Sequence, residues 1–325
     1  MSKKFNNKYL LIAFAALILL FVFVKFYRSV KTESTLKTDI VKIDTAKISK
    51  ILLYPLSEKG KEIVFTKEGK VWKVSNGNIS TETQKNTLGN LIYQLIDIKP
   101  KRLASRSKDK WAEYQVTDTT ATRVKVFEGE KEALNLYIGK FTYQQVSDPS
   151  GSGRSGIVGT SYVRLADEKE VYAVDGFLSF GFNQPFNNWR NQSFVHFNKS
   201  DVTKLTFRYP GDSSFVAELK GKKWTINNQP VDSIILTNYL AMLGNKTAST
   251  FDDNYTPVGN SQFQITIEGN NMSNITVDGF AKDNSNFVIN SSLNPKSWFT
   301  SDRKGLFKEV FVGMKGFMPG KKKQK

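Results

Sequence analysis

EGKVWKVSNG (Glu68–Gly77) and KGKKWTINNQ (Lys220–Gln229) are two versions of one short pattern in this chain of 325 residues. Each has a glycine turn, then a tryptophan in an alternating, strand-like run, and then a turn that contains asparagine. One such pattern arises easily in a lysine-rich protein. The fold therefore depends on whether the neighbours of the two stretches also repeat in the same order.

The neighbours do repeat in the same order, which is the sign of an internal duplication. The matching pairs are Asp44–Pro55 with Ser200–Pro210, Glu62–Val74 with Phe215–Ile226, Thr81–Ile98 with Val231–Asn245, Ala121–Phe141 with Ser261–Phe280, Ser161–Leu165 with Asn286–Asn290, and Val171–Phe182 with Ser297–Phe311. Chance could produce one match, but six in one order favour two copies of a domain.

Each copy is predicted to contain antiparallel strands and one main helix. Short β-branched and aromatic runs bounded by glycine or proline indicate strands and hairpins. The third matching pair instead has a helical period, with apolar residues at Leu88, Leu91, Ile92 and Leu95 in one copy and Leu236, Tyr239, Leu240 and Leu243 in the other. Ser80 or Thr81, with Gln84, and Asp232 or Ser233 are the expected caps. The predicted fold class is α+β.

The domain plan follows from this duplication. Asp148–Thr160, DPSGSGRSGIVGT, is a Gly/Ser-rich insertion in the first copy and predicts a hairpin loop; it lacks the ending of a phosphate loop. The predicted segments are a basic tail at 1–8, a transmembrane signal-anchor at 9–27, a juxtamembrane linker at 28–43, α+β repeats at 44–198 and 199–318, and a basic tail at 319–325.

The anchor rests on the uncharged run YLLIAFAALILLFVFV (Tyr9–Val24). A helix over residues 9–27 would be roughly 28 Å long, against a bilayer core of about 30 Å. A cleavable signal peptide is the alternative, but aromatic and basic residues rather than small ones follow this run. We expect a single-pass membrane protein whose short N-terminal tail stays in the cytoplasm and whose large C-terminal domain lies on the other side of the membrane.

Composition excludes several kinds of chemistry. There is no cysteine and one histidine, His196, so thiolate metal sites and cysteine catalysis are excluded and histidine-based sites are disfavoured. His196 lies between two phenylalanines, and Asp167–Glu168 and Asp252–Asp253 are adjacent carboxylates expected on solvated turns. We predict no catalytic residues, no cofactor and no metal, and hence no enzyme.

The net charge of +17 is spread along the chain. Its densest run, KPKRLASRSKDK, is either a solvated face or an anion- or partner-facing patch made of Lys99, Lys101, Arg102, Arg106, Lys108 and Lys110. Aromatic residues are not interleaved with this run, so nucleic acid is not an expected partner. Trp72 and Trp224 are interpreted as equivalent core tryptophans of the two repeats rather than as ligand-stacking residues.

The strand and helix order, the Tyr-Val-Arg strand at Tyr162–Arg164 and the bridge WRNQSFVHFNKSDVTKL (Trp189–Leu205) resemble the family called domain of unknown function 4340, over roughly residues 44–311. The resemblance implies a bacterial protein with one N-terminal span, so we expect a single-pass protein of the bacterial inner (cytoplasmic) membrane whose C-terminal domain lies on the periplasmic side. It also implies that the protein is encoded beside an ABC-transporter ATPase and permease and a partner related to gliding-motility membrane components. It supplies no catalytic residues. The strongly basic balance and the long Gly/Ser loop depart from the commoner pattern.

Two functional hypotheses of different classes follow. The first is a non-enzymatic, membrane-anchored extracytoplasmic protein that serves as an accessory or adaptor subunit of an ABC-transporter-type envelope complex. Its partners would be the lipid bilayer, through residues 9–27, and the permease, ATPase and associated component. The alternative is an ectodomain that binds an anionic envelope polymer or glycan in the cleft between the two repeats. An envelope hydrolase would need two carboxylates that converge in a pocket.

Overall fold

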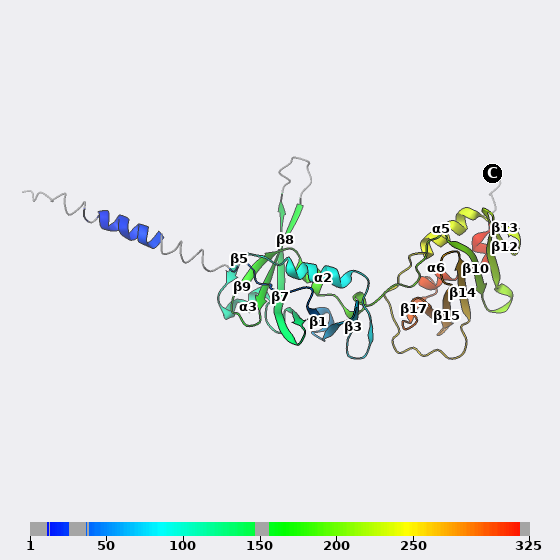
Figure 1. The fold of residues 1–325 in the computed structure, drawn as a ribbon, viewed down its shortest axis with the longest axis horizontal. Helices are drawn as coiled ribbons and strands as arrows, with labels where there is room; N and C mark the ends of the chain where they lie inside the picture. The colour runs from blue at the N-terminus through cyan, green and yellow to red at the C-terminus, as the bar shows by residue number, and fades with distance from the viewer. Residues whose placement is uncertain (1–11, 13, 26–36, 38, 147–155, 319–325) are drawn as a thin grey trace, which may run out of the picture. The chain divides into compact units, whose positions relative to one another are not determined.

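The computed structural model describes residues 12, 14–25, 37, 39–146 and 156–318 (Figure 1). The two predicted tails, at 1–8 and 319–325, lie outside the described residues. So do residues 26–36 of the predicted anchor and linker, and most of the predicted Gly/Ser loop, at 147–155.

The described part of the predicted anchor is helical. Residue 12 and residues 14–25 have helical backbone, and their side chains are exposed. The ends of the predicted span at 9–27 fall outside the described residues. Across the parts of the chain that the structure describes, no helix combines the length and the hydropathy that a membrane crossing needs.

The first sheet has nine strands in the order β4-β3-β2-β1-β6-β7-β8-β9-β5, and all the defined registers are antiparallel. The strands are β1 (Ile48–Tyr54), β2 (Ile63–Glu68), β3 (Val71–Ser75), β4 (Ser80–Glu82), β5 (Pro100–Ser105), β6 (Thr122–Glu128), β7 (Lys131–Val146), β8 (Gly156–Leu165) and β9 (Val171–Asp175). The helices among them are α2 (Thr87–Ile96), α3 (Trp111–Tyr114) and α4 (Leu178–Phe182), with short 3-10 turns at Leu56–Glu58, Lys108–Lys110 and Phe186–Asn188.

The second sheet has eight strands in the order β13-β12-β11-β10-β14-β15-β16-β17, also antiparallel. The strands are β10 (Val202–Arg208), β11 (Phe215–Lys220), β12 (Lys223–Ile226), β13 (Gln229–Pro230), β14 (Phe263–Gly269), β15 (Ile275–Ala281), β16 (Asn286–Ser291) and β17 (Phe299–Asp302). The helices are α5 (Ser233–Leu243) and α6 (Leu306–Val310), with 3-10 turns at Gly211–Ser213 and Met314–Phe317.

The two sheets have the same strand order. Strands β4-β3-β2-β1-β6-β7-β8-β9 correspond one by one to β13-β12-β11-β10-β14-β15-β16-β17, and only β5 is additional. In the first sheet β5 pairs with β9, and the equivalent of β9 in the second sheet is β17. The segment after α5 takes the place of β5, because its residue Phe251 forms a β-bridge with Phe299 of β17. Both sheets are therefore large, antiparallel and accompanied by few helices, which agrees with an α+β class.

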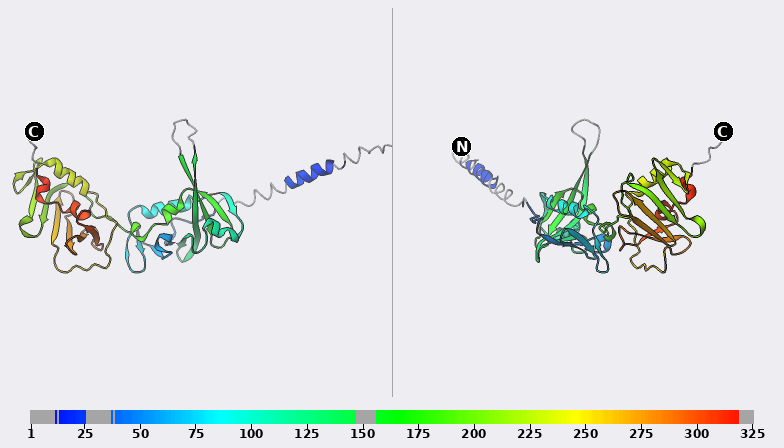
Figure 2. Two further views of the ribbon diagram at one scale, coloured as in Figure 1. Left: turned by 180° about the vertical axis from the view of Figure 1, so that it is seen from behind. Right: turned by 45° about the vertical axis from the view of Figure 1, so that its right-hand side comes forward.

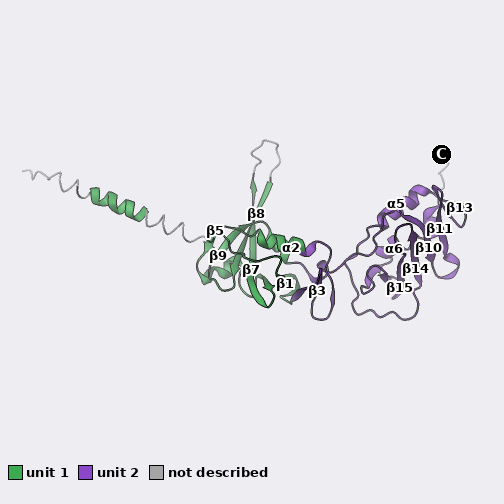
Figure 3. Cartoon of the chain, in the orientation of Figure 1, with its two compact units in different colours: residues 1–62, 89–183 green, residues 63–88, 184–325 purple. Residues whose placement is uncertain are grey.

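Packing divides the chain into two compact units, residues 1–62 with 89–183 and residues 63–88 with 184–325 (Figure 3). Strands β2, β3 and β4 thus belong to the first sheet by hydrogen bonding but pack with the second unit. Within that unit, the ring of Trp189 lies edge-on to Phe65 with centroids 5.3 Å apart. The Gln84 amide donates to the Trp189 carbonyl at 2.7 Å. The predicted boundary between 198 and 199 lies between β9 and β10, whereas residues 184–198 pack with the second unit.

Both main helices bury the predicted apolar residues, except for Ile92, which is only half-buried, and only one helix begins where expected. Asp232 caps α5, because its carboxylate accepts hydrogen bonds from the amides of Ile234 and Ile235 at 2.9 and 3.3 Å. The predicted cap of the first helix at Ser80 or Thr81 is wrong. Ser80–Glu82 pair with β3 as strand β4, so α2 begins only at Thr87.

The two tryptophans of the repeated pattern occupy equivalent register positions but differ in burial. Trp72 lies opposite Lys67, and Trp224 lies opposite Leu219. Trp224 is 5% exposed and belongs to the core of the second sheet, whereas Trp72 is only partly buried. Leu219 packs against the same core as Trp224, whereas the position opposite Trp72 holds the exposed Lys67, and we infer that this charged neighbour reduces the burial of Trp72. The interpretation of both as core residues therefore holds fully for Trp224 alone.

Buried tyrosines predict that the fold loses stability at alkaline pH. Burial, together with a hydrogen bond to Glu62, raises the pKa of Tyr54 to about 12, and burial also raises the pKa of Tyr209 and Tyr239. Tyr209 and Tyr239 donate to the carbonyls of Val312 and Val310 at 3.0 and 2.7 Å. A tyrosine whose pKa is higher in the folded than in the unfolded state contributes its full stabilisation at pH values below the unfolded pKa. This stabilisation is lost as the pH rises from the unfolded pKa through the folded pKa.

We therefore expect the free energy of unfolding to decline from about pH 10, where unfolded tyrosines ionise. Urea unfolding followed by circular dichroism at several pH values between about 8 and 11 measures this decline. The variant Y209F/Y239F should show a shallower dependence on pH. A free energy that stays constant over this range in the unaltered chain would contradict the expectation.

Candidate functional site

The predicted basic patch lies along one edge of the first sheet. Lys101 and Arg102 belong to the edge strand β5, Lys99 precedes it, and Arg106, Lys108 and Lys110 follow it. All six side chains are exposed. Lys101 pairs with Asp175 at 2.5 Å and Lys110 with Glu113 at 2.9 Å, whereas the other four have no ion pair within the described residues. The six cations are thus spread over the edge strand, the residues that flank it and the 3-10 turn at Lys108–Lys110.

The position of the patch supplies an explanation that needs no ligand. The outer side of an edge strand presents unpaired backbone groups to solvent, and natural sheets protect such edges with lysine, proline and bulges. Strand β5 has Pro100, cations on its exposed side and register shifts between Pro100 and Arg102 and between Leu103 and Ser105. These features protect the edge, and an anionic partner is not required to account for them.

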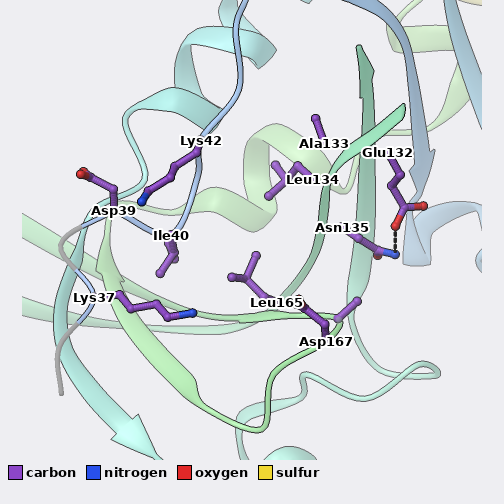
Figure 4. A pocket seen from close by; sticks show the side chains of 11 residues that line it. Lys37, Asp39, Ile40, Lys42, Glu132, Ala133, Leu134, Asn135, Leu165 and Asp167 are labelled. Carbon is purple, nitrogen blue, oxygen red and sulfur yellow. Dashed lines mark hydrogen bonds between the residues drawn. The ribbon is translucent and has the colours of Figure 1, made fainter. Parts of the chain in front are cut away.

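A cavity of about 510 Å³ lies where the chain enters the first unit (Figure 4). Residues 37–42 form one side of it, and the starts of β7 and of the turn after β8 form the other. Ile40, Leu134 and Leu165 supply apolar lining, and Ile40 is 5% exposed. Residues 37–42 of the predicted juxtamembrane linker at 28–43 thus border the unit, and Ile40 is buried against it.

Three of the polar residues that line this cavity have partners within the unit. Lys37 forms an ion pair with Glu168, and the hydrogen bond in this pair raises the pKa of Lys37. Asn135 donates to Glu132 at 2.8 Å and accepts from the guanidinium of Arg123 at 2.9 Å. Lys37, Glu132 and Asn135 therefore already serve contacts inside the unit.

The carboxylates and the histidine that the sequence singled out do not meet. Asp252 pairs with Lys282 and Asp253 with Arg190, both at 2.7 Å, so this loop is engaged in ion pairs rather than simply solvated. Exposed His196 shares a hydrogen bond with Asn245 at 2.8 Å. In the described part of the chain, no group of three or more histidine, aspartate or glutamate residues could hold a metal ion.

Arg164, the arginine of the Tyr-Val-Arg strand, is a buried structural cation. Its guanidinium lies 3.7 Å from the ring centre of Trp111 and 4.2 Å from that of Tyr137. Its Nε donates to the carbonyl of Val116 at 3.1 Å. Burial lowers the pKa of Arg164, and no described carboxylate forms an ion pair with it. Arg164 therefore joins the α3 region to the sheet and is not available to a ligand.

Arg190, in the bridge that follows Trp189, is the second buried arginine. It is 1% exposed, donates from Nη1 to both carboxylate oxygens of Asp253 at 2.7 and 3.0 Å, and stacks on Phe251 with 3.8 Å to the ring centre. Its backbone forms a β-bridge with Thr83. Sequence reasoning missed this ion pair, although the one arginine within an otherwise uncharged stretch from Phe177 to Asn198 was a signal for it.

Comparisons with known proteins identify a family for the chain. No curated protein and no solved structure is significantly similar to the chain. The sequence pattern described as a domain of unknown function, number 4340, matches residues 77–257, which include Arg164, Arg190 and Asp253. These three residues serve the fold in the structure. Since the match covers more than half of the sequence, the chain belongs to the family called domain of unknown function 4340.

Proposed function

We propose that the chain is a non-enzymatic, membrane-anchored extracytoplasmic protein that acts as an accessory or adaptor subunit of an ABC-transporter-type envelope complex. The observation that carries the anchoring is the exposed apolar surface of the N-terminal helix. Leu17 and Phe21 are 66% and 68% exposed, and their apolar neighbours are exposed as well. An apolar surface of this kind is unfavourable in water and is normally covered by lipid or protein.

The adaptor role is supported by the chemistry of the two units. Lys37 at the first cavity pairs with Glu168, and Lys246 and Glu309 at the second pair with each other, so these charges are engaged within the units. Extensive sheet surface, in which the described histidine and carboxylates that the sequence singled out do not converge, suits binding rather than catalysis. The link to a transporter comes from the family resemblance, which implies that the protein is encoded beside an ABC-transporter ATPase and permease.

Charge placed in the N-terminal helix should release the protein from the membrane. Replacing both Leu17 and Phe21 with arginine is expected to move the protein to the soluble fraction, because each arginine at the centre of a span costs about 2.5 to 3.5 kcal/mol of insertion free energy. Carbonate extraction measures the shift, with the L17I/F21L variant as the matched control. An L17R/F21R protein that stays fully in the membrane pellet would contradict the anchor.

The location and the partners need separate measurements. A C-terminal alkaline phosphatase fusion should be active if the units are extracytoplasmic, and an inactive fusion would overturn that placement. Affinity purification from native membranes in mild detergent should recover an ATPase and a permease together with the chain. Recovery of the chain without them would leave the anchor intact and refute the adaptor role.

A further inference from the structure

The hairpin of β7 and β8 extends beyond the rest of its sheet in every view (Figure 2). We call the described part of this extension the arm, made of residues 141–146 of β7 and 156–160 of β8. Pairing of β7 with β6 stops at Ile138, and pairing of β8 with β9 stops at Thr160. Along the arm, the two strands therefore pair with each other, from Phe141 with Ser161 to Val146 with Gly156.

The arm is uncharged, although charged residues make up 24% of the chain. Its exposed side chains are apolar or neutral, and Tyr143 and Ile157 are 67% and 64% exposed. It contains neither the lysine nor the proline that normally protects an exposed strand edge. Its outer edges are therefore open to pairing with another strand.

Every other edge in the two sheets is short, charged or covered. Strand β4 has three residues and ends at Glu82, β5 is basic, and β13 has two residues. The last strand, β17, receives the Phe251 bridge. The arm thus differs from the other strand edges of the two sheets. Its lack of protecting residues is therefore not a general feature of this protein.

Aromatic packing fixes the base of the arm. The ring centroids of Phe141, Phe177 and Phe180 are 4.9 to 5.6 Å apart. Phe177 also covers Gly159, where a side-chain carbon would come within 2.7 Å of its ring. Since the glycine allows this close contact, the arm is held in a defined position on the sheet and is presented as an ordered strand edge.

We propose that the arm pairs with the arm of a second copy of this chain, antiparallel, along the outer edge of β7 at residues 142–146. Pairing about a two-fold axis places each strand opposite itself, and in an uncharged strand no register creates a like-charge pair. A chain of net charge +17 would repel its copy along the basic edge at β5. Self-pairing is therefore favoured at the one long edge without charge, and this inference does not depend on the proposed function.

Other occupants fit the arm less well. An acidic partner would be attracted to the cations of β5 rather than to a neutral strand. A lipid surface would leave the amides of Gln144 and Gln145 and the open backbone groups without hydrogen-bond partners. Both remain distinguishable outcomes of the experiment below.

The absence of cysteine allows a direct test in the full chain in its membrane. Single cysteines at positions 142 to 146 are oxidised, and disulfide-linked dimers are measured on non-reducing gels. K101C, on the exposed edge strand β5, is the matched control. Because a disulfide needs Cβ atoms about 3.5 to 4.5 Å apart, the position nearest the two-fold axis should give about tenfold more dimer than the control.

A charge exchange gives an independent measurement that does not rely on disulfides. Q144K and Q144E should each lower the dimer fraction in detergent, because like charges meet across the pair, and mixing the two proteins should restore it. Circular dichroism of each variant shows whether the fold is intact. The dimer fraction of the unaltered chain should rise with salt, since screening reduces repulsion between the two copies.

Three results would overturn the proposal. Arm cysteines that cross-link no better than K101C would exclude close self-pairing. An adduct of different mass would assign the arm to another protein. Protection of the arm cysteines in bilayers but not in detergent, without dimers, would assign it to lipid.

Discussion

Replacing Asp253 with alanine is expected to lower the free energy of unfolding of the second unit by about 3 kcal/mol, because the substitution leaves the charge of Arg190 buried without a counter-ion. Arg190 is 1% exposed at its side chain, whereas that of Asp253 is 29% exposed. The two members of the pair are therefore unequal. Removal of the carboxylate leaves a buried cation that water cannot reach. The Nε of Arg190 already has no hydrogen-bond partner among the described residues.

Removing the arginine instead should cost less. R190M keeps much of the side-chain volume next to Phe251 and leaves a carboxylate that solvent can reach, so a change within about 1.5 kcal/mol is expected. The double variant R190M/D253A should then be about as stable as R190M. If the two side chains contributed to stability only through their attraction to each other, D253A and R190M would instead lower the free energy of unfolding by equal amounts.

Asp252 provides a matched control on the same loop. Its ion pair with Lys282 joins side chains that are 17% and 46% exposed. Exposed ion pairs contribute about 0.2 to 1 kcal/mol, so D252A should have a small effect. Urea unfolding of the four variants measures the comparison. A D253A protein as stable as D252A would contradict the burial argument.

The sequence predicted those features of the fold that local patterns encode. Alternation located most strands of both sheets, though not β4, β5 or β13, the helical period located α2 and α5, and Asp232 was one of the two expected caps of α5. These features depend on neighbours a few residues away. The start of α2 was missed because Ser80–Glu82 pair with β3, and that pairing competes with the capping pattern.

The candidate site residues were harder to predict because their roles depend on distant partners. The basic run after α2 was identified, but its role as an edge strand depends on β9, some 70 residues later in the chain. The pair of Arg190 with Asp253 spans 63 residues. Ile40 lies in the predicted juxtamembrane linker, and it is buried beside Leu134 of β7 and Leu165 of β8, which are far from it in the sequence. Contacts between residues so far apart leave no periodic pattern in the local sequence.

The repeated tryptophans give the second large expected effect. Trp224→Ala should lower the free energy of unfolding by about 3 to 5 kcal/mol, the usual cost of removing a large aromatic side chain from a packed core. Trp224 packs within the apolar cluster that includes Ile226, Leu236 and Leu240. The loss should be visible as a lower urea midpoint for the second unit.

Trp72→Ala is the matched comparison, because the residue has the same register in the other sheet and differs in its cross-strand neighbour. Partial burial limits its expected cost to about 1 to 2 kcal/mol. If Lys67 causes the difference, K67L should raise the cost of removing Trp72, and L219K should lower the cost of removing Trp224. Equal costs in both sheets, unaffected by these neighbours, would show that the cross-strand residue does not control burial. A W72A protein that keeps its stability but loses a binding partner would instead make Trp72 a contact residue, because a tryptophan without a large role in packing is free to serve recognition.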